Sequence, residues 1–296
     1  MKFISYAQNF EDVMLRRALK RVKKGFYVDV GAQDPVRDSV SKAFYEMGWH
    51  GINIEPVSIW FDKLSVDRPR DINLRVAASS SDGEVTLYEV KDSGLSTMDV
   101  DYAKNYSHDG MEVVEHSVQT RTLSSILADA SVQEIHFLKV DVEGAEESVL
   151  RGMDFSKYRP WIILVEARLP NSTRDAFRSW ESLIVSAGYT FAWDDGLNRF
   201  YYANEHRRLA RAFKLPPNVF DQFVTYDESH LSELSRWAHE LETRLAQAED
   251  VIATQAGLAA QLEAQHQDLL KLDAALQEAQ ASQSVVMADR DEVTRW

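Results

Sequence analysis

Two kinds of hydrophobic pattern alternate along the chain between residues 26 and 203. In the first, a short run is almost continuously apolar, which is typical of a parallel strand covered on both faces. In the second, apolar residues recur at every third or fourth position, which is typical of a helix with one buried face. The alternation predicts βαβ units and an α/β fold with a doubly wound sheet. The expected strands span 25–31, 51–56, 72–79, 135–144 and 161–167, and the expected helices span 38–49, 58–64, 144–153 and 173–188.

Two segments interrupt this alternation. The runs at 83–90 and 116–123 predict an inserted part that is more antiparallel. The segment 189–204 predicts two strands joined by a turn at Asp194-Asp195-Gly196, because an Asp-Gly pair favours a tight hairpin turn.

The pattern changes after Pro216 and Pro217, which end the globular part. Apolar residues then recur at alternating steps of three and four, as in the seam of a coiled coil. We therefore expect a first domain over 1–226 and a coiled-coil helix over 227–296, through which the chain forms a dimer or trimer. The seam consists of Leu231, Leu234, Ala238, Leu241, Leu245, Ala248, Ile252, Leu262, Leu269 and Leu276.

Polar residues interrupt the seam. Gln255, His266 and Asp273 fall on core positions if the register is kept, and Leu272 restores the pattern in a shifted register, so a stutter near 265–272 is expected. The last residues of the chain carry no helix-capping signal. We therefore expect the helix to be cut there and to continue in the native protein.

Composition narrows the class of protein. The 296 residues carry a formal net charge of −14, which argues against a nucleic-acid partner, since such proteins usually show a basic face. There are no cysteines, which excludes disulfides, thiolate metal sites and a cysteine nucleophile. No run of about 18 apolar residues occurs, so no membrane span is expected, and the N-terminal residues lack the apolar segment of a secretory signal. These features predict a cytoplasmic protein.

Chemistry is expected where the strands end. Asp29 lies at the end of the first strand, and Gly31 follows in a turn tight enough to hold a nucleotide-like cofactor. The full G-x-G-x-x-G fingerprint is absent, which disfavours a pyrophosphate, because a diphosphate needs several backbone N–H groups close by. S-adenosylmethionine needs only the tight turn. Its cationic sulfonium and amino groups favour a nearby acid such as Asp29.

Further strands also end in acids. Glu55 ends the second strand, where a ribose-binding carboxylate is expected. Asp141 lies at the end of the fourth strand, beside the crevice at the topological switch point, and Glu143 begins the turn into the next helix. Glu166 ends the fifth strand. Asp141 or Glu143 can be interpreted as a helix cap, but four strands that end in acids at one rim are hard to explain by capping alone.

Six segments carry a family resemblance, in family order from about residue 5 to residue 168: YAQNFEDVML, GFYVDVGAQDPVRDSVSKAFYEMGWHGINIEP, GLSTM, HSVQTRTLSSIL, FLKVDVEGAEESVLRGMDF and RPWIILVEA. In these segments the chain resembles the FkbM family of S-adenosylmethionine-dependent methyltransferases. The resemblance implies the class I methyltransferase fold, a Rossmann-like seven-stranded sheet of order 3-2-1-4-5-7-6. It also implies O-methylation, often of sugars in bacterial glycans or of natural products. The coiled-coil segment falls outside it.

The resemblance also implies roles for single residues. Asp29 and Gly31 would hold the methionine end of S-adenosylmethionine, Glu55 would bind the ribose hydroxyls, and Asp141 would lie beside the transferred methyl group. Two residues match the N-terminal signature of the family and would close over the cofactor, namely Gln8 and Asp12.

Methyl transfer to a hydroxyl requires that the hydroxyl lose its proton. Asp141 is one candidate to accept it. His116 is another, because it lies in the inserted segment where a substrate loop would be. A divalent metal is the alternative route, since Asp141 and Glu166 on adjacent strands could bind Mg²⁺ through oxygen.

The predicted function is therefore S-adenosylmethionine-dependent O-methylation of a sugar hydroxyl in a bacterial surface glycan, for example an O-antigen. A natural product or other small hydroxylated acceptor is the alternative, and so is a non-catalytic scaffold that assembles through its coiled coil. A nicotinamide or nucleotide-sugar enzyme would need phosphate contacts that the sequence does not offer. The long helix suggests partners such as a second copy and a glycosyltransferase or other glycan-assembly enzyme, with a peripheral place at the inner membrane.

Overall fold

The computed structural model describes residues 2–91, 93–170 and 172–293, with the side chains of the last helix described up to residue 284. The chain divides into two compact units, one that ends at Ser229 and one that begins at His230. The sequence predicts this boundary after residue 226. The end of the chain, where we expected the helix to be cut, includes residues 294–296, which lie outside the described residues.

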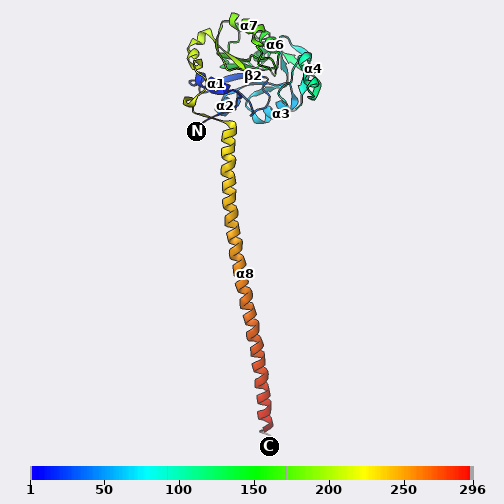
Figure 1. Cartoon of the computed structure of the whole chain (residues 1–296), viewed down its shortest axis with the longest axis vertical. Helices are drawn as coiled ribbons and strands as arrows, with labels where there is room; N and C mark the ends of the chain where they lie inside the picture. Colours follow the sequence, from blue (N-terminus) through cyan, green and yellow to red (C-terminus); the bar gives the residue numbers. More distant parts are fainter. Residues whose placement is uncertain (1, 92, 171, 294–296) are drawn as a thin grey trace. The chain divides into compact units, whose positions relative to one another are not determined.

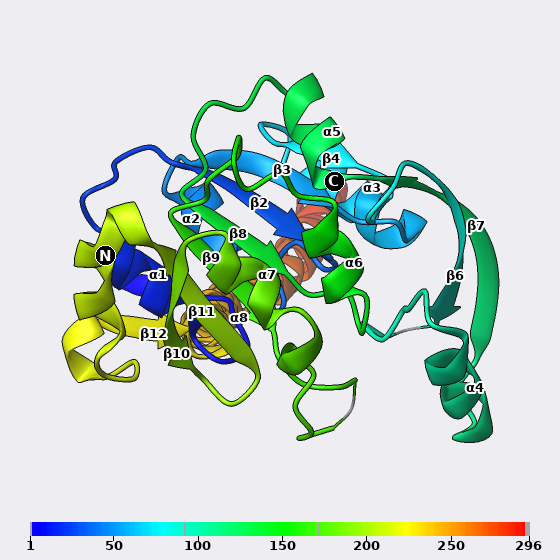
Figure 2. The same cartoon turned by 90° about the horizontal axis from the view of Figure 1, so that it is seen from above.

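A seven-stranded sheet forms the centre of the first unit (Figure 2). Six of the seven strands run in the same direction, and β11 is antiparallel to its neighbours β9 and β10. Counted along the chain from the β4 edge, the strand order is 3-2-1-4-5-7-6, the order that the family resemblance implied. The strands are β4 (Ile72–Leu74), β3 (His50–Ile54), β2 (Phe26–Val30), β8 (Phe137–Val140), β9 (Ile162–Glu166), β11 (Asn198–Ala203) and β10 (Tyr189–Asp194).

Helices cover both faces of this sheet, because successive side chains of a strand point to opposite faces. Val28 and Val30 of β2 belong to the core shared with α5, α6 and α7. Tyr27, which precedes them, packs with Met14 of α1 and Phe44 of α2 on the other face. The helices are α1 (Glu11–Leu19), α2 (Lys42–Glu46), α3 (Ser58–Asp67), α5 (Leu123–Asp129), α6 (Glu146–Arg151) and α7 (Glu181–Ser186).

The expected strand at 72–79 is divided between two sheets. Its first half is β4, whereas β5 (Ala77–Ala78) pairs with β7 (Val113–Arg121), and Ser79 continues this pairing through its N–H to the Arg121 carbonyl. β7 is also antiparallel to β6 (Gly83–Val90), so the inserted part is antiparallel as expected. Figure 2 shows the β6–β7 ribbon at the periphery of the unit, beside α4 (Val100–His108).

The hairpin expected at 189–204 is confirmed, since β10 and β11 pair on either side of the Asp194–Gly196 turn. Two expected helices are shorter than predicted. α2 begins late because the Asp34 side chain accepts the N–H groups of Val36 and Arg37 and holds the preceding residues in a turn. The helix expected at 173–188 is reduced to a short 3₁₀ turn, η1 (Phe177–Ser179), and α7, because Asp175 pairs with Arg168 instead.

The two ends of the first unit are joined to each other. β1 (Phe3–Ser5) pairs in parallel with β12 (Phe223–Thr225). Arg17 of α1 donates from two of its side-chain nitrogens to the two carboxylate oxygens of Asp221, at the end of η3 (Val219–Asp221). The remaining element, η2 (Asn204–Phe213), places Phe213 in the core beside α1. The first unit is thus closed before the last helix begins.

The last element is a single helix, α8 (Tyr226–Val293), of 68 residues (Figure 1). Thr225 and Glu228 exchange hydrogen bonds at its start, the Glu228 N–H donating to the Thr225 hydroxyl and the Thr225 N–H to the Glu228 carboxylate. This is a capping box, which satisfies two otherwise unpaired N–H groups. The seam side chains Leu231, Leu241, Leu245 and Ile252 are all exposed in the single chain. Within the part of the chain that the structure describes, no helix combines the length and apolar character needed to cross a membrane.

The exposed seam predicts self-association of the chain. Light scattering should give a dimer or trimer for the full chain at micromolar concentration and a folded monomer for residues 1–229, because the seam buries apolar area only between copies. Leu241→Glu combined with Leu245→Glu should shift the full chain toward the monomer.

The matched control adds the same two charges away from the seam. Ala246→Glu combined with Gln247→Glu alters two positions that lie outside the seam set of the same helix and should leave the assembly intact. A full chain that is monomeric, or a truncated chain that stays oligomeric, would contradict this prediction.

Candidate active site

The turn after β2 brings two strand ends into close contact. Gly31 has a φ of +74°, and a Cβ at this position would collide with the carbonyl oxygen of Asp141. Its N–H donates to the carbonyl of Ile54 at 2.9 Å. Only glycine satisfies both the left-handed conformation and this close approach. The ends of β2, β3 and β8 therefore meet at one point, as the sequence analysis expected for its strand-end acids.

Glu55 organises the neighbouring loops. Its two carboxylate oxygens accept the N–H of Val57 at 2.8 Å and the N–H of Gln33 at 2.9 Å. Gln33 itself has a φ of +49°, a conformation that persists only when its surroundings hold it, as this hydrogen bond does. Glu55 is buried, and burial raises its pKa to about 7. Each oxygen keeps one acceptor position free, so a hydroxyl in the cavity could still donate to it.

Lys139 is the central cation of the site. The register of the parallel β2–β8 pair sets Asp29 opposite Lys139. The ammonium lies 3.5 Å from Asp29 Oδ1 and 3.2 Å from Asp141 Oδ2, and it donates to the carbonyl of Gly31 at 2.8 Å. Burial alone would lower the pKa of Lys139, but Asp141 and Asp29 outweigh it, and the pKa is raised. Lys139 was not among the residues expected from the sequence, although a lysine within an otherwise apolar strand was a visible signal.

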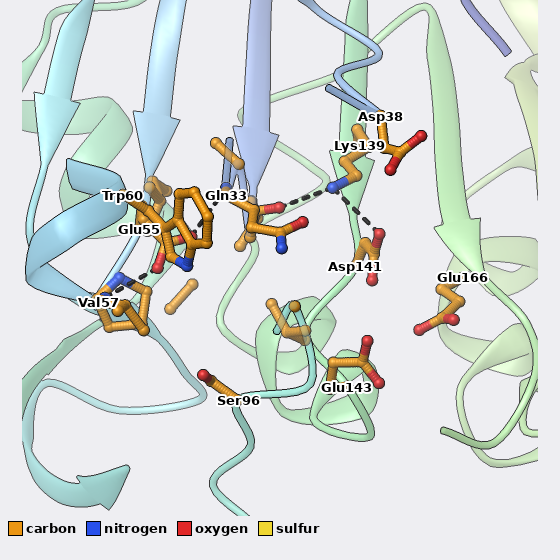
Figure 3. Close-up of a pocket in the computed structure, with 18 of the residues that line it drawn as sticks. Gln33, Asp38, Glu55, Val57, Trp60, Ser96, Lys139, Asp141, Glu143 and Glu166 are labelled. Carbon is orange, nitrogen blue, oxygen red and sulfur yellow. Dashed lines mark hydrogen bonds and ion pairs between the residues drawn. The ribbon is translucent and has the colours of Figure 1, made fainter. Parts of the chain in front are cut away.

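A cavity of about 280 Å³ opens at these strand ends (Figure 3). Figure 3 shows Glu55, Val57 and Trp60 on one side of it and Asp141, Glu143 and Glu166 on the other. Among the described residues that line the cavity, Lys139 is the one basic side chain, against six acids. The acids are Glu11, Asp38, Glu55, Asp141, Glu143 and Glu166. The cavity therefore favours a cationic occupant and disfavours phosphate.

Three carboxylates gather on the side of β8 and β9. Asp141, Glu143 and Glu166 each offer one oxygen, and these oxygens all lie within 4.8 Å of one another. Burial and the neighbouring Asp141 raise the pKa of Glu166 to about 10 and that of Glu143 to about 8. Glu143, which the sequence analysis interpreted as part of a turn or cap, reaches the cavity from a residue with a φ of +53°.

The side chain that caps this loop is Glu146, not Asp141 or Glu143 as one interpretation of the sequence suggested. Glu146 accepts the N–H of Val142 at 3.2 Å and the N–H of Gly144 at 3.1 Å through the same oxygen. This carboxylate therefore holds the turn into α6 together. Asp141 and Glu143 are not needed for that purpose, and their side chains line the cavity instead.

The N-terminal signature contributes differently from what was expected. Gln8 lines the cavity, but Asp12 does not: it is fully buried and accepts the Ser5 hydroxyl at 2.6 Å and the Tyr6 N–H at 2.8 Å. Asp12 thus holds the loop that carries Gln8. Its neighbour Glu11 lines the cavity and accepts the side-chain N–H of Asn198 at 2.7 Å. Sequence spacing alone could not show which of the adjacent acids points inward.

Two other expected site residues lie outside the cavity lining. Asp29 is buried behind Gly31, accepts the Ser41 hydroxyl at 2.6 Å and meets Lys139, so it acts on the cavity through these partners. His116 is on β7, is 43% exposed, and lies 2.7 Å from Glu89. His116 pairs across the ribbon with Leu87, which lines the cavity, but its own side chain lies beside Glu89 and is not part of the lining that contains Asp141.

The strand order and the acidic rim are those of a methyltransferase-type α/β domain. The family model for the methyltransferase FkbM domain matches residues 29–191, which is more than half of the chain. The chain therefore belongs to the FkbM methyltransferase family, and the resemblance seen in the sequence is confirmed. A comparison with curated proteins found no match.

The position of Lys139 predicts a large loss of stability when its charge is removed. Lys139→Met leaves Asp29 and Asp141 without their shared cation, and the free energy of unfolding should fall by roughly 3 kcal/mol, the typical cost of breaking a buried ion pair. Urea denaturation measures this loss.

Lys63→Met is the matched control: its exposed ion pair with Asp34 at 3.5 Å should contribute less than about 1 kcal/mol. Adding Asp141→Asn to Lys139→Met should restore part of the loss. Equal stability of the two lysine variants would remove Lys139 from this role.

The buried acids predict an unusual dependence of stability on pH. Burial raises the pKa of Glu11 to about 8 and that of Glu55 to about 7, so the folded chain keeps protons that the unfolded chain has released above about pH 4.5. Stability should therefore fall as pH rises from 5 to 8. His136 and His206 act in the opposite direction, since burial lowers the pKa of each.

Thermal unfolding without ligand measures this balance. The melting temperature should be at least about 4 °C lower at pH 8 than at pH 5.5, the shift expected for roughly 1–2 kcal/mol in a domain of this size. Glu11→Gln combined with Glu55→Gln should flatten part of the profile, since Glu143 and Glu166 also keep protons in this range. A melting temperature that rises across this range would mean that the histidines outweigh the buried acids.

Proposed function

We propose that the chain is an S-adenosylmethionine-dependent O-methyltransferase that acts on a sugar hydroxyl of a bacterial surface glycan, for example an O-antigen. The observation that carries the cofactor assignment is the charge of the cavity, with six acids and Lys139 as the one described basic side chain. A nicotinamide or sugar-nucleotide cofactor would bring phosphates into this field. S-adenosylmethionine brings a sulfonium and an ammonium instead, and the Rossmann-like strand order supports a nucleoside cofactor at these strand ends.

The residues present fit this cofactor. Gly31 provides a backbone surface without a Cβ, Glu55 has free acceptor positions for ribose hydroxyls, and Trp60 and Val57 offer apolar surface for a base. When bound, the cofactor would supply an electrophilic methyl group. Asp141, at the switch point, is the residue that we propose accepts the acceptor's hydroxyl proton, since Lys139 pairs with its Oδ2 and leaves Oδ1 available.

The acceptor is proposed to enter on the side of β9 and β11. Gln8, Glu11 and Asn198 line this side of the cavity with amide and carboxylate groups. Such groups both donate to and accept from hydroxyls, which suits a sugar or another small hydroxylated acceptor. A cytoplasmic location fits a metabolite cofactor of this kind.

The long helix is proposed to join two or three copies and to set a distance between the enzyme and a partner. At 1.5 Å per residue, the 68 residues of α8 extend over about 100 Å. A glycosyltransferase or other glycan-assembly enzyme at the inner membrane is the proposed partner, because a spacer of this length would matter to an enzyme that modifies a growing glycan.

Calorimetry with S-adenosylmethionine tests the cofactor assignment. The wild-type chain should bind it and should not bind NAD⁺. Glu55→Gln should weaken binding about tenfold to a hundredfold, as expected for loss of a charged hydrogen bond of about 1.5–3 kcal/mol. Asp62→Asn removes an exposed acid from α3 and serves as the control. Equal affinity of wild type and Glu55→Gln, with both folded, would refute the assignment.

Turnover with a panel of neutral glycans tests the reaction. Asp141→Asn should keep most of the affinity for S-adenosylmethionine and lose most of the methyl transfer, with the product located by mass spectrometry. Transfer to nitrogen or carbon would contradict O-methylation. Unchanged turnover would remove Asp141 from the mechanism.

A further inference from the structure

The three carboxylates beside the cavity have the geometry of a cation site. Asp141 and Glu143 follow β8, Glu166 ends β9, and one oxygen from each lies within 4.8 Å of the other two (Figure 3). Two oxygens bound to one ion can be separated by at most twice the metal–oxygen distance. At about 2.4 Å, a distance within the range for Ca²⁺, this limit is about 4.8 Å, and small side-chain shifts would suit Mg²⁺ at about 2.1 Å.

A buried oxygen without a partner points to a missing ligand. Glu166 is only 8% exposed, and its Oε2 is buried with no hydrogen-bond partner. The hydroxyl of Tyr106 on α4 is also buried and without a hydrogen-bond partner among the described residues, and burial together with the charges of Glu143 and Glu166 raises the pKa of Tyr106. A buried carboxylate oxygen that makes no hydrogen bond is costly. A cation at this point would compensate it.

Among the described groups, a proton shared between Glu166 and Asp141 is the compensation that the protein itself offers, and a bound cation would displace that proton. Lys139 reaches Asp141 at 3.2 Å, but its ammonium is also engaged by the Gly31 carbonyl and Asp29. Among the described residues, the carboxylate of Glu143 makes no hydrogen bond or ion pair, and only its backbone carbonyl accepts one, from Thr97. The turn that contains Glu143 is held by Glu146, so its side chain is not required for capping.

We propose that Asp141, Glu143 and Glu166 bind a hard divalent cation of the Mg²⁺, Mn²⁺ or Ca²⁺ class. Carboxylate oxygens suit these ions, and three protein ligands leave positions for water or an acceptor hydroxyl. The sequence pointed to Asp141 and Glu166 alone, and Glu143 completes the set. A hydroxyl held in an open position would lose its proton more readily than in water, and Asp141 would then act as a ligand of the cation rather than as the direct proton acceptor. This catalytic role rests on the proposed methyl transfer, whereas binding of the cation does not.

Manganese is the probe that tests the site. The full chain, freed of metal with a chelator and without cofactor, should bind one Mn²⁺ per chain in an electron paramagnetic resonance titration, and Mg²⁺ or Ca²⁺ should compete. Glu143→Gln and Glu166→Gln should each weaken Mn²⁺ binding at least tenfold. Glu147→Gln removes an exposed carboxylate of α6 that pairs with Arg151 and should bind as wild type does.

Thermal unfolding shows whether the variants are folded. Mn²⁺ should raise the melting temperature of wild type and of Glu147→Gln, and it should not raise that of Glu143→Gln or Glu166→Gln, because only a ligand that binds the folded state stabilises it. Without metal, Glu166→Gln should melt no lower than wild type, since glutamine has nearly the shape of glutamate and brings no charge into the buried cluster. Absence of Mn²⁺ binding by wild type at millimolar concentration, or unchanged affinity in both cluster variants, would overturn the proposal.

A second titration separates the cation from the cofactor. If S-adenosylmethionine displaces Mn²⁺, the carboxylates are the binding place of the cofactor's own positive charge and the proposal is overturned. Simultaneous binding of both supports it. Calorimetry of S-adenosylmethionine with the metal-free chain tests the proposed function separately, so failure of the metal site and failure of the cofactor assignment give different results.

Discussion

The pairing of Lys139 with Asp29 and Asp141 is the interaction on which the site depends. It occurs because the parallel register sets Lys139 opposite Asp29, and because Gly31 lets the two strand ends approach until its carbonyl also meets the ammonium. One cation thereby joins the ends of β2 and β8. It does not balance the rim, however, since the acids outnumber it and the pKa values of Glu55, Glu143 and Glu166 remain raised. The folded chain therefore retains protons on these acids at neutral pH, at the place where a cationic ligand would displace them.

A second buried cation, Arg68, stabilises Asp29 on the side that faces away from Lys139. Arg68 is fully buried and donates to the Pro35 carbonyl and to the hydroxyls of Ser39 and Ser41. Ser41 in turn donates to Asp29. Asp29 is thus enclosed between an arginine network and Lys139, which explains why it does not line the cavity although it lies at the tip of a central strand. Its effect on a ligand is indirect, through the position of the lysine and of the loop after Gly31.

The sequence revealed much of the sheet and part of the site, for a physical reason. Strand runs and their terminal acids are local patterns, and parallel strands bring their carboxyl ends to one edge, so Glu55, Asp141 and Glu166 could be expected to meet. The orientation of side chains outside regular strands could not be read in this way. Whether Glu11 or Asp12 points inward depends on Asn198, which is 187 positions away from Glu11. Glu143 reaches the cavity through a left-handed backbone conformation, which is uncommon for glutamate and could not be predicted from its residue type. The split of 72–79 between two sheets depended on β7, a strand that follows much later in the chain.

The last helix differs from the rest of the chain because its apolar residues are not buried within a single copy. Isolated helices gain little stability from propensity alone, and most helices in proteins are stabilised by packing of an apolar face. Eight large seam residues of α8 are exposed in the single chain: Leu231, Leu234, Leu241, Leu245, Ile252, Leu262, Leu269 and Leu276. If pairing buried each by about half, at roughly 1 kcal/mol per residue, two chains would gain on the order of 16 kcal/mol. The loss of translational and rotational freedom on association is about 4–15 kcal/mol, so the seam is sufficient to favour assembly. Polar residues such as Gln255 and His266 would reduce this gain and restrict the register, which is how a single polar core position acts in coiled coils.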